Sequence, residues 1–369
     1  MAMSLTLKDS LALREPFPHL RERVYLDTAA AGLTWHGEGA AVARFYEEIK
    51  SRGYDARPEW LANTIKVKAR LAAWLGVTPA DVSFVSNTTE GLNLAAHSLR
   101  YAAGDRIVLA DNEFPSVIGI WAPALRAGAQ LVRVPIPREA EREAALIAAL
   151  DGGAKLLAVS QVHSGTGTTV DLGRLGRACR ERGVLLMVDG MQALGAVPTD
   201  LSLVDVYSAS FFKWMLSGFG AGILATSRAA RRAMTPAFHG YANAGGGPDG
   251  EAQLQYAHVN IPALYGLDAT LDFFERIGWA QVFERVRGLG CHLIEGAARH
   301  GLDLITPPAA HAGIFVLRTA DGEAVREQLS AEGISVSARG EGIRISPHFY
   351  NTAEEVDRCL SALAAAAHR

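Results

Sequence analysis

Short apolar runs alternate with amphipathic stretches between residues 81 and 227. The amphipathic stretches, such as DLGRLGRACRERG at residues 171–183, place apolar residues at helical spacing and close on a glycine. The apolar runs have the length and the branched content of strands, and they occupy residues 81–86, 105–111, 129–135, 155–162, 184–190, 204–210 and 221–227. Strands that alternate with helices predict an α/β fold, with a mostly parallel sheet flanked by helices on both faces. Ligands of such sheets bind at the carboxyl ends of the strands.

The pattern changes beyond residue 260. Helical periodicity with few interruptions predicts long helices over residues 260–301. The chain then reads as strand, helix, strand and helix over residues 311–319, 321–333, 342–349 and 352–369. This order predicts a smaller C-terminal α+β domain. We therefore divide the chain into an N-terminal segment at residues 1–30, a large domain at 31–285 and a small domain at 286–369.

Composition and charge narrow the function classes. The 369 residues are 49% hydrophobic and 20% charged, which is ordinary for a globular protein, and the length favours two domains. A net charge of -3 and a pI of about 6.4 argue against a nucleic-acid partner, which would require a basic surface. No apolar run approaches the roughly 20 residues of a membrane span. The N-terminus lacks the pattern of a signal peptide.

The three cysteines, Cys179, Cys291 and Cys359, show neither a disulfide framework nor the spacing of metal ligands. Each lies in an amphipathic stretch or begins one, which predicts buried or half-buried structural thiols. These features favour a cytoplasmic protein, because thiols stay reduced in that compartment.

The stretch SASFFKWMLSGFGAG at residues 208–222 places Lys213 in an apolar and aromatic setting. Lys213 follows a predicted strand, at the end where ligands bind. A desolvated amine there would have a lowered pKa and could act as a nucleophile toward an aldehyde. The alternative is a side chain that passes the aromatic surface and reaches water, and the residue alone favours neither interpretation.

Asp189 ends the apolar run VLLMVD at residues 184–189. A carboxylate at the tip of a buried strand needs a partner. The protonated ring nitrogen of pyridoxal phosphate is one, because a carboxylate beside it makes the ring an electron sink. The alternative is a helix N-cap, a common role of aspartate. Gln192, three residues later, could reach a ring hydroxyl.

A phosphate group is held well by backbone amides and hydroxyls at a helix N-terminus. The segment SNTTEGLNLAAHSL at residues 86–99 offers them, with Thr88 and Thr89 just before an apolar helical run. An ordinary capped helix is the alternative, and it is the more common outcome for such a segment by itself. Ser208 and Ser210, upstream of Lys213, are further candidate phosphate ligands.

Together these features resemble the class V aminotransferases, a family of fold-type I pyridoxal phosphate enzymes. The resemblance rests on Asp189 with Gln192, on Lys213 at the expected distance, and on the segments SNTTEGLNL, NIPALYGL and RISPHFYNTAEEVDR. It runs from VYLDTAAAG at residues 24–32 to the C-terminus. The family includes cysteine desulfurases, isopenicillin N epimerase-like proteins and kynureninase. It implies a homodimer, with helices of the large domain at the contact between subunits.

The resemblance also implies roles for individual residues. Lys213 would hold the cofactor as an internal aldimine and move the substrate proton, and Asp189 would pair with the pyridine nitrogen. Arg344 would clamp the substrate carboxylate with its planar guanidinium. The other implied cofactor contacts are Thr88, Thr89 and Ser210 to the phosphate, Gln192 and Ser164 near the ring oxygen, Phe114 stacked on the ring, and His258 and Asn260 toward the cofactor of the neighbouring subunit.

Three departures separate the chain from cysteine desulfurases. Phe212 stands where they carry a histidine before the lysine, and Ser164 stands where they carry an asparagine. The segment before Arg344, ISVSARGEG at residues 334–342, is short and lacks the catalytic loop cysteine of that group. A persulfide relay is therefore not expected. The EFPS and FKW variants resemble the epimerase-like and lyase-like branch.

The resemblance implies an enzyme that acts on an α-amino acid through an external aldimine and a Cα carbanion. We expect an aminotransferase or a β-lyase, with an amino-acid epimerase or a desulfurase-like protein without the loop cysteine as alternatives. A non-catalytic pyridoxal phosphate-binding protein and a nucleotide-binding protein are less consistent with the sequence, which has no Walker or dinucleotide motif. Four further residues could contact a substrate side-chain carboxylate but are each interpreted as surface charges: His36, Arg52, Arg57 and Arg339.

Overall fold

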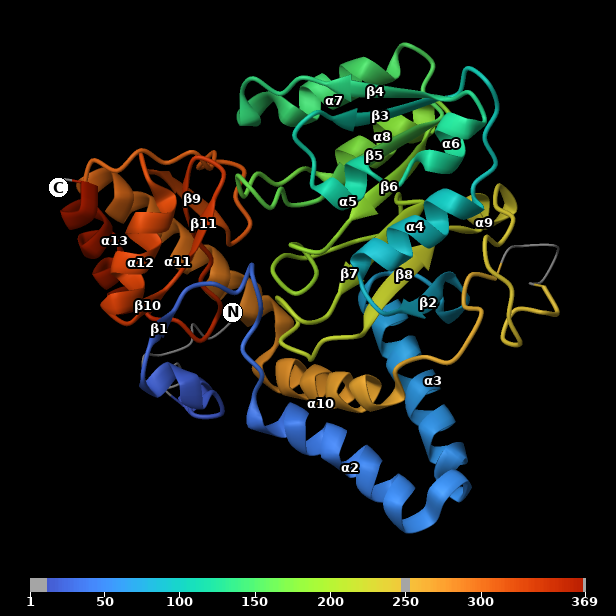
Figure 1. Ribbon diagram of the computed structural model, residues 1–369, viewed down its shortest axis with the longest axis horizontal. Coiled ribbons are helices and arrows are strands. Elements are labelled where there is room, and N and C mark those ends of the chain that lie inside the picture. Colours follow the sequence, from blue (N-terminus) through green and yellow to red (C-terminus); the bar gives the residue numbers. More distant parts are fainter. Residues whose placement is uncertain (1–11, 247–252, 368–369) are drawn as a thin grey trace.

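The computed structural model describes residues 12–246 and 253–367, so residues 1–11 of the predicted N-terminal segment lie outside it. A seven-stranded sheet with the order β2-β8-β7-β6-β5-β3-β4 lies at the centre of the large unit (Figure 1). Its strands are β2 (Val82–Val85), β3 (Arg106–Ala110), β4 (Gln130–Val134), β5 (Leu156–Ser160), β6 (Leu185–Asp189), β7 (Val206–Ser210) and β8 (Gly222–Thr226). Each strand lies within one of the seven predicted runs, which confirms them.

The sheet is mostly parallel, as predicted. The pairs β3–β4, β3–β5, β5–β6 and β6–β7 are parallel, whereas β8 pairs antiparallel with both β7 and β2. The connection from β7 to β8 covers only residues 211–221. A connection this short joins antiparallel neighbours, because a parallel crossover needs a dozen or more residues. The turn that carries Lys213 therefore leaves the sheet at the carboxyl end of β7 and leads directly into the neighbouring strand β8.

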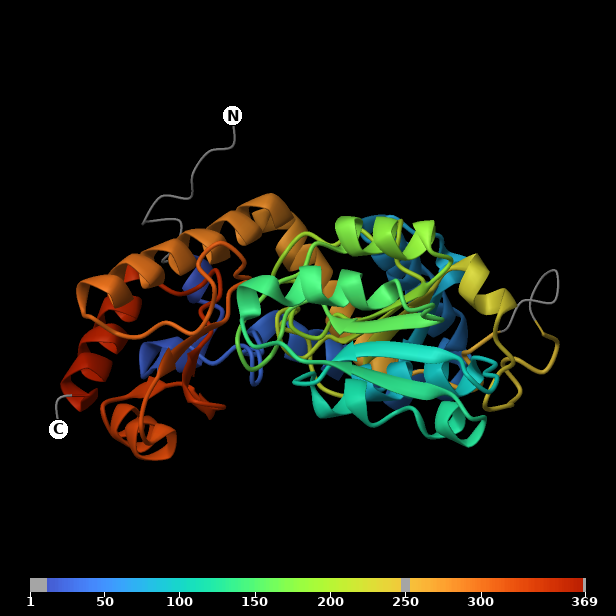
Figure 2. The same ribbon diagram turned by 90° about the horizontal axis from the view of Figure 1, so that it is seen from above.

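Helices cover both faces of this sheet (Figure 2). One face packs against α3 (Arg57–Trp74), α7 (Arg142–Leu150), α8 (Leu172–Glu181) and α10 (Ile261–Ile277). The other packs against α4 (Thr88–Ser98), α5 (Pro115–Ile118), α6 (Ala122–Arg126) and α9 (Arg228–Arg232). Alternate strand residues serve the two cores, so Val108 belongs to the first core and Ile107 to the second. Burial on both faces explains why each strand is a continuous apolar run.

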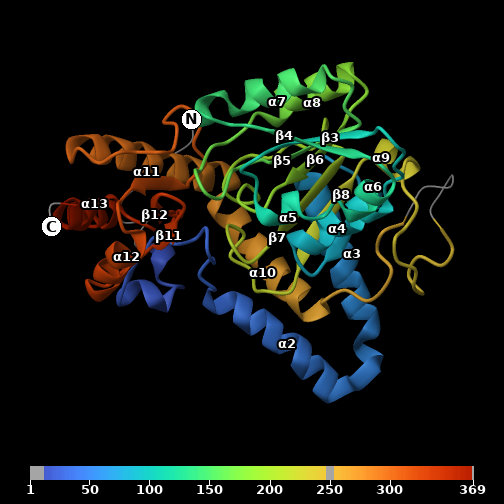
Figure 3. The same ribbon diagram turned by 45° about the horizontal axis from the view of Figure 1, so that its top comes forward.

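Helix α2 (His36–Arg52) lies alongside α10 and joins α3 through the 3-10 helix η2 (Gly53–Ala56), as Figures 1 and 3 show. The other 3-10 helices are η1 (Pro18–Arg21), η3 (Pro79–Asp81) and η4 (Glu139–Glu141). Across residues 12–246 and 253–367, no helix combines the length and the apolarity needed to cross a membrane.

A smaller α+β unit contains the C-terminal part of the chain. Its antiparallel sheet has the order β11-β12-β9, formed by β11 (Ser337–Arg339), β12 (Gly342–Ile345) and β9 (Phe315–Arg318). The helices α11 (Trp279–Arg299), α12 (Gly322–Ala331) and α13 (Ala353–Ala367) pack around its apolar core. The predicted order of strand, helix, strand and helix is present, and β11 is an additional strand.

The start of the chain packs with its end (Figure 1). Strand β1 (Val24–Tyr25) pairs in parallel with β10 (Ile334–Ser335), and Leu26 joins the apolar core of the smaller unit. The proposed boundary between residues 285 and 286 falls inside α11, which is one continuous helix. The division into three domains stays a prediction.

Candidate active site

A cavity of about 230 Å³ lies at the carboxyl ends of β5, β6 and β7, where parallel sheets bind ligands. Residues from the N-terminus of α4 and from the turn after β7 complete its walls. The lining consists of Asn87, Thr88, Thr89, Phe114, Ser116, Ser160, Val162, Ser164, Asp189, Met191, Gln192, Ser210, Phe212 and Lys213. The structure thus brings together all the predicted site residues except Ser208, Arg344, His258 and Asn260.

Asp189 and Lys213 face this cavity with shifted pKa values. Burial raises the pKa of Asp189, at the end of β6, to about 6, although the Met191 N–H donates a hydrogen bond to its Oδ1 (2.8 Å). Burial and, next in size, the positive charge of Arg344 lower the pKa of Lys213 to about 8. Within the described residues, Lys213 Nζ has neither an ion pair nor a hydrogen bond. Two opposite charges therefore share one cavity without contact between them.

Close backbone contacts hold the turn that carries Lys213. The Gly32 N–H donates to the Phe212 carbonyl (2.8 Å), and a Cβ atom at Gly32 would lie 2.0 Å from the Lys213 carbonyl oxygen. Leu216 adopts a φ of 52°, in the left-handed region, while its N–H donates to the same Lys213 oxygen (3.1 Å). A non-glycine residue in that region costs on the order of 1 kcal/mol. The surrounding contacts therefore impose this backbone shape on the turn.

Hydroxyl groups gather where α4 begins. The Oγ atoms of Thr88 and Ser210 lie 2.9 Å apart, and the backbone N–H of each donates to the hydroxyl of the other (2.8 and 2.9 Å). Thr89 Oγ1 lies 2.8 Å from the hydroxyl of Ser116, a residue that the sequence analysis did not identify. The first turn of a helix also offers unpaired backbone N–H groups. Ser208, by contrast, is fully buried, and its hydroxyl donates to the Thr88 carbonyl (3.1 Å).

Phe114 and Gln192 line the cavity from two other sides of the fold. Phe114 follows β3 and is 43% exposed, so part of its ring is available for stacking. Gln192 Nε2 donates to the Ala29 carbonyl (3.0 Å), and its Oε1 accepts from the Trp214 indole (2.8 Å). Gln192 therefore also joins the N-terminal segment to the turn of Lys213, and one amide hydrogen remains for a ligand.

Arg344 projects from β12 and is 3% exposed. Its Nη1 donates to the Ser164 carbonyl (3.2 Å), and its Nη2 lies 3.6 Å from Asp27 Oδ1. That second distance is too long for a hydrogen bond, and both Nε and Nη2 lack a hydrogen-bond partner within the described chain. A buried guanidinium with unpaired N–H groups suits a bidentate contact with a carboxylate.

His258 and Asn260 lie elsewhere. They line a separate cavity of about 110 Å³ with Tyr256 and Glu90. Asn260 begins α10, where its Oδ1 accepts from the Ala263 N–H (3.3 Å). Neither residue lines the 230 Å³ cavity of its own chain. Their predicted contact with the cofactor of a neighbouring subunit stays a prediction.

The cysteines lie outside the lining of the cavity. Cys179 and Cys359 are buried, as predicted, and burial raises the pKa of each thiol to about 12. The prediction is wrong for Cys291, which is exposed on α11. The apolar face of α11 contains Leu289 and Leu293. Cys291 lies two residues from each of them and therefore points to the opposite side of the helix.

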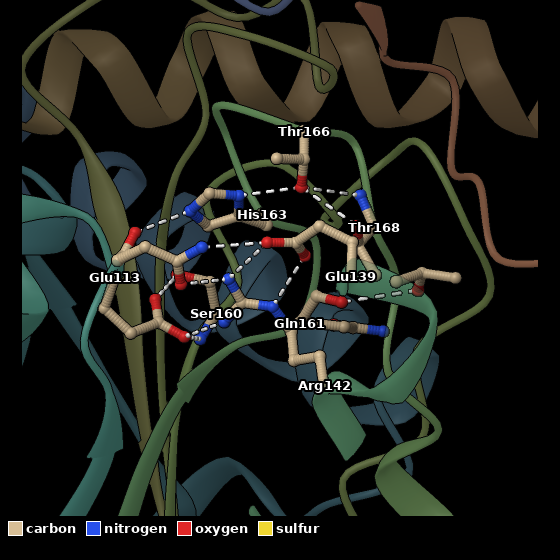
Figure 4. Close-up of polar contacts among 10 residues, drawn as sticks. Glu113, Glu139, Arg142, Ser160, Gln161, His163, Thr166 and Thr168 are labelled. Carbon is tan, nitrogen blue, oxygen red and sulfur yellow. Dashed lines mark hydrogen bonds and ion pairs between the residues drawn. The ribbon is translucent and has the colours of Figure 1, made fainter. Parts of the chain in front are cut away.

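A buried polar network beside the cavity was not predicted (Figure 4). The Glu113 carboxylate accepts from Arg142 Nη1 (3.0 Å), from the Ser160 N–H (3.1 Å) and from the Ser160 hydroxyl (2.5 Å). Arg142 also donates to Glu139 (3.0 Å) and to the side chain of Asn112 (2.5 Å). Glu113 directly precedes the wall residue Phe114. The network therefore fixes the loop after β3 against the end of β5.

His163 links the same loop to the segment of Ser164. Its Nε2 donates to the Asn112 carbonyl (2.8 Å), because a carbonyl can only accept, and its Nδ1 lies 2.8 Å from the Thr166 hydroxyl (Figure 4). Burial and the charge of Arg142 lower the pKa of His163, which keeps the ring neutral. A histidine directly after an apolar strand was the available sequence signal for this contact.

The described residues fit pyridoxal phosphate, the cofactor that the sequence resemblance implies. A carboxylate, an amine with a lowered pKa and a hydroxyl-rich helix N-terminus surround one space. These groups match the ring nitrogen, the aldehyde and the phosphate of that molecule. The absence of an ion pair between Asp189 and Lys213 leaves the space between them for the ring.

Comparisons with known proteins agree with this fit. The family model described as Aminotransferase class-V matches residues 24–359. The chain is 30% identical to isopenicillin N epimerase of Amycolatopsis lactamdurans, over 93% of this chain and 96% of the relative. It is 25% identical to a probable cysteine desulfurase of Methanothermobacter thermautotrophicus, over 93% of this chain and 94% of the relative.

Solved structures show the same fold. A cysteine desulfurase of Thermococcus onnurineus NA1 matches with a TM-score of 0.87 and 22% identity over the whole of both chains. A cystine C–S lyase in complex with cysteine persulfide matches with a TM-score of 0.86 and 24% identity, over 94% of this chain and 99% of that one. The family match covers most of the sequence, and the chain therefore belongs to the class V aminotransferase family of pyridoxal phosphate-dependent enzymes.

Proposed function

We propose that the protein acts on an α-amino acid as an aminotransferase or a β-lyase. The observation that carries this proposal is the cavity that Asp189 and Lys213 share, with the Arg344 guanidinium beside it. Arg344 Nη1 donates to the carbonyl of the lining residue Ser164, while its Nε and Nη2 lack hydrogen-bond partners in the described chain. An α-amino acid offers its carboxylate to Arg344 and its Cα proton to the cavity. Bound pyridoxal phosphate supplies an electron sink for the negative charge that develops at Cα.

Asp189, Lys213 and Arg344 have different roles in the proposed reaction. The pKa of Asp189, about 6, leaves this carboxylate ionised at neutral pH, as a partner for a protonated ring nitrogen. The pKa of Lys213, about 8, leaves part of the Nζ unprotonated, so this amine serves as nucleophile toward the aldehyde and as base for the Cα proton. Arg344 fixes the carboxylate and thereby the direction of the bond that breaks.

The lining favours chemistry with one base. With Asp189 paired to the ring nitrogen, Lys213 is the remaining lining side chain that titrates near neutral pH among the described residues. A two-base inversion at Cα needs a second acid, and Phe114 offers none. One base suffices to move a proton from Cα to the cofactor in transamination, or to take it in β-elimination.

Epimerisation is the second candidate. The observation that favours it is the 30% identical relative named isopenicillin N epimerase. In this alternative, Lys213 would remove the Cα proton on one face, and a proton would return to Cα from the opposite face. A desulfurase-like protein without the loop cysteine stays an alternative, which the relative named probable cysteine desulfurase supports. A persulfide relay is not part of this proposal, because the loop between β11 and β12 consists of Gly340 and Glu341 and contains no cysteine.

We also propose a homodimer in the cytoplasm. Exposed apolar side chains follow α2, η2 and α3, an arrangement typical of a protein contact: Tyr46, Ile49, Tyr54, Leu61 and Ile65. The three cysteines are free, which supports a reducing compartment. A second copy on this surface would also provide the neighbouring subunit that His258 and Asn260 require.

Mass spectrometry of cofactor and products tests the proposed function. Cofactor-loaded protein is incubated with a panel of amino acids that includes cysteine, cystine and S-conjugates. Pyridoxamine phosphate with a keto acid identifies an aminotransferase, whereas retained pyridoxal phosphate with pyruvate, ammonia and a thiol identifies a β-lyase. Chiral chromatography detects epimerisation. Cofactor binding without conversion of any amino acid would contradict all three reactions.

The role of Lys213 is tested in the same material. After borohydride reduction, we expect the cofactor mass on the peptide that contains Lys213, and its loss in Lys213→Ala. The control is Lys66→Ala, because Lys66 is exposed and binds Asp268 (2.8 Å) outside the cavity. A cofactor that stays covalently attached to Lys213→Ala would overturn the assignment.

A further inference from the structure

The hairpin of β11 and β12 places a second arginine beside the proposed substrate clamp. In its register, Ser337 pairs with Arg344, and Arg339 pairs with Gly342. Residues that pair across a ladder point to the same face of the sheet, and so do residues two apart on one strand. Ser337, Arg339 and Arg344 therefore share one face. Ala338 and Ile343 occupy the other face, which packs on the apolar core.

The face of Arg339 is the one that meets the active site. The Ser337 hydroxyl donates to Asp27 Oδ2 (2.7 Å), and Arg344 contacts both Asp27 and the Ser164 carbonyl. Arg339 is the next β11 residue on that face, two residues after Ser337, and it is exposed. Diagonal neighbours of this kind lie roughly 7–8 Å apart in the backbone. Arg339 and Arg344 therefore extend from neighbouring positions of one face.

Arg339 has no acidic partner. Its Nη1 donates to the Ala338 carbonyl (3.1 Å), and it forms no ion pair with any residue that the structure describes. Two other arginines of the smaller unit do have acidic partners: Arg318 pairs with Asp303 (2.7 Å) and Arg326 with Glu323 (2.6 Å). An unpaired guanidinium at the edge of a site is free to bind an anion.

The positive charge of Arg339 influences the pKa values of Lys213 and Asp27. Burial is the main cause of the lowered pKa of Lys213, Arg344 is the next, and Arg339 acts in the same direction. Arg339 also acts to lower the pKa of Asp27, although burial raises that pKa overall. Two positive side chains thus face the region where a substrate would lie.

We propose that Arg339 binds a second anionic group of the substrate, so that the protein prefers α-amino acids with an acidic side chain. This inference rests on the proposed function. Arg344 holds the α-carboxylate, and the side chain then extends along the hairpin face to Arg339. The sequence alone favoured a surface charge, whereas the register of the hairpin and the missing acidic partner favour contact with a substrate.

Pairs of amino acids that differ in charge but not in shape test this inference. We measure kcat/KM of the cofactor-loaded protein for aspartate against asparagine and for glutamate against glutamine. Wild type should prefer the acidic member about tenfold or more, as expected for a hydrogen-bonded ion pair. Arg339→Gln should lose that preference. Arg339→Lys should keep part of it, because the charge stays while the planar fork is lost. The matched control is Arg326→Gln on α12, which should keep the full preference.

A binding measurement decides the inference independently of turnover. Calorimetric titration of the cofactor-free protein compares glutarate, which has two carboxylates, with butyrate, which has one. Glutarate should bind more tightly to wild type, and Arg339→Gln should remove the difference. Equal affinities in wild type, or a preference that survives Arg339→Gln in either assay, overturns the inference. Loss of turnover for every amino acid would instead contradict the proposed function, and the titration would still decide the role of Arg339.

Discussion

At the scale of single residues, Asp189 and Lys213 are largely buried side chains of opposite charge that line one cavity without an ion pair between them. Each charged form loses hydration on folding, which is why the pKa of Asp189 rises and the pKa of Lys213 falls. A ring nitrogen and an aldehyde would supply the missing partners. The cofactor-free fold therefore contains unfavourable charges that a bound cofactor relieves.

Asp189→Asn should raise the stability of the cofactor-free protein and weaken cofactor binding. The pKa of Asp189 is raised from 3.8 in the unfolded chain to about 6 in the folded protein. Below pH 3.8 the carboxyl is neutral in both states, and the stability of the folded protein is highest with respect to this group. As the pH rises through about 6 the buried carboxyl ionises, and that stability is lost. At pH 7 the uncharged variant avoids this loss, which amounts to roughly 2–3 kcal/mol at one pKa unit per 1.4 kcal/mol. Denaturant unfolding at pH 7 and near pH 4 measures the gain, which should vanish at the lower pH.

The control for this variant is Asp268→Asn. Asp268 accepts from Arg70 (2.6 Å) and Lys66 (2.8 Å), so the neutral amide should destabilise the protein at pH 7. An Asp189→Asn variant that is also destabilised, or that binds pyridoxal phosphate as tightly as wild type, would contradict the assigned role.

At the scale of elements, the loop after β3 depends on the network of Glu113, Arg142 and His163. Loops at the carboxyl edge of a sheet are exposed and carry function, so they need support from the rigid elements. Here Arg142 of α7 and Ser160 of β5 bind Glu113, and His163 binds the Asn112 carbonyl. The wall residue Phe114 is therefore positioned by a network in which Arg142 and His163 do not line the cavity themselves.

Glu113→Ala should destabilise the protein by about 3 kcal/mol, because the variant leaves the buried Arg142 without one of its carboxylate partners. The measurement is the midpoint of denaturant unfolding, compared with Glu323→Ala. Glu323 is exposed and paired with Arg326, so its loss should change stability by less than about 0.5 kcal/mol. Similar effects of the two substitutions would show that the network does not support the fold.

The elements that the sequence predicts well are those buried on both faces. Continuous apolar runs identify the seven central strands because helices cover both sides of the sheet. Strand β11 escapes prediction because it covers only three residues, one of them the exposed Arg339. Pairing of β1 with β10 has no local pattern, because the two segments lie at opposite ends of the chain.

The candidate site is predictable where one polar residue interrupts an apolar pattern. Asp189 and Lys213 are such residues, at the ends of runs that turn out to be adjacent strands. The residues that support the site are not conspicuous in the sequence. Arg142 begins the stretch REAALIAAL, where a charge is typical of an exposed first turn, and its burial depends on Glu113 from a distant loop.

At the scale of the whole molecule, α2 and α3 carry the apolar surface on which a second copy would sit. Light scattering should give twice the chain mass of 39.3 kDa for wild type. The double substitution Tyr54→Glu and Ile65→Glu should yield monomers, because it places charges on side chains that are 70% and 69% exposed in the single chain.

The control for the assembly is Leu125→Glu on α6, an exposed apolar residue outside that surface. This variant should scatter as wild type does. A dimer that persists in the Tyr54 and Ile65 double variant would show that the subunits meet on another face.

The contacts between the β1 segment and the β10 segment set the order in which parts of the fold can form during synthesis. Asp27 binds Ser337, which follows 310 residues later, so at typical elongation rates its partner emerges on the order of 15 to 60 s afterwards. Lys213, Asp189 and the hydroxyls around α4 leave the ribosome well before Arg344. The residues that fit the cofactor can therefore fold on a nascent chain. Strand β1 and Leu26, by contrast, have no partners until roughly the last hundred residues are synthesised. We expect a chain stopped before β10 to retain the central sheet and its cavity, with an apolar N-terminal strand left unpaired for a chaperone to cover.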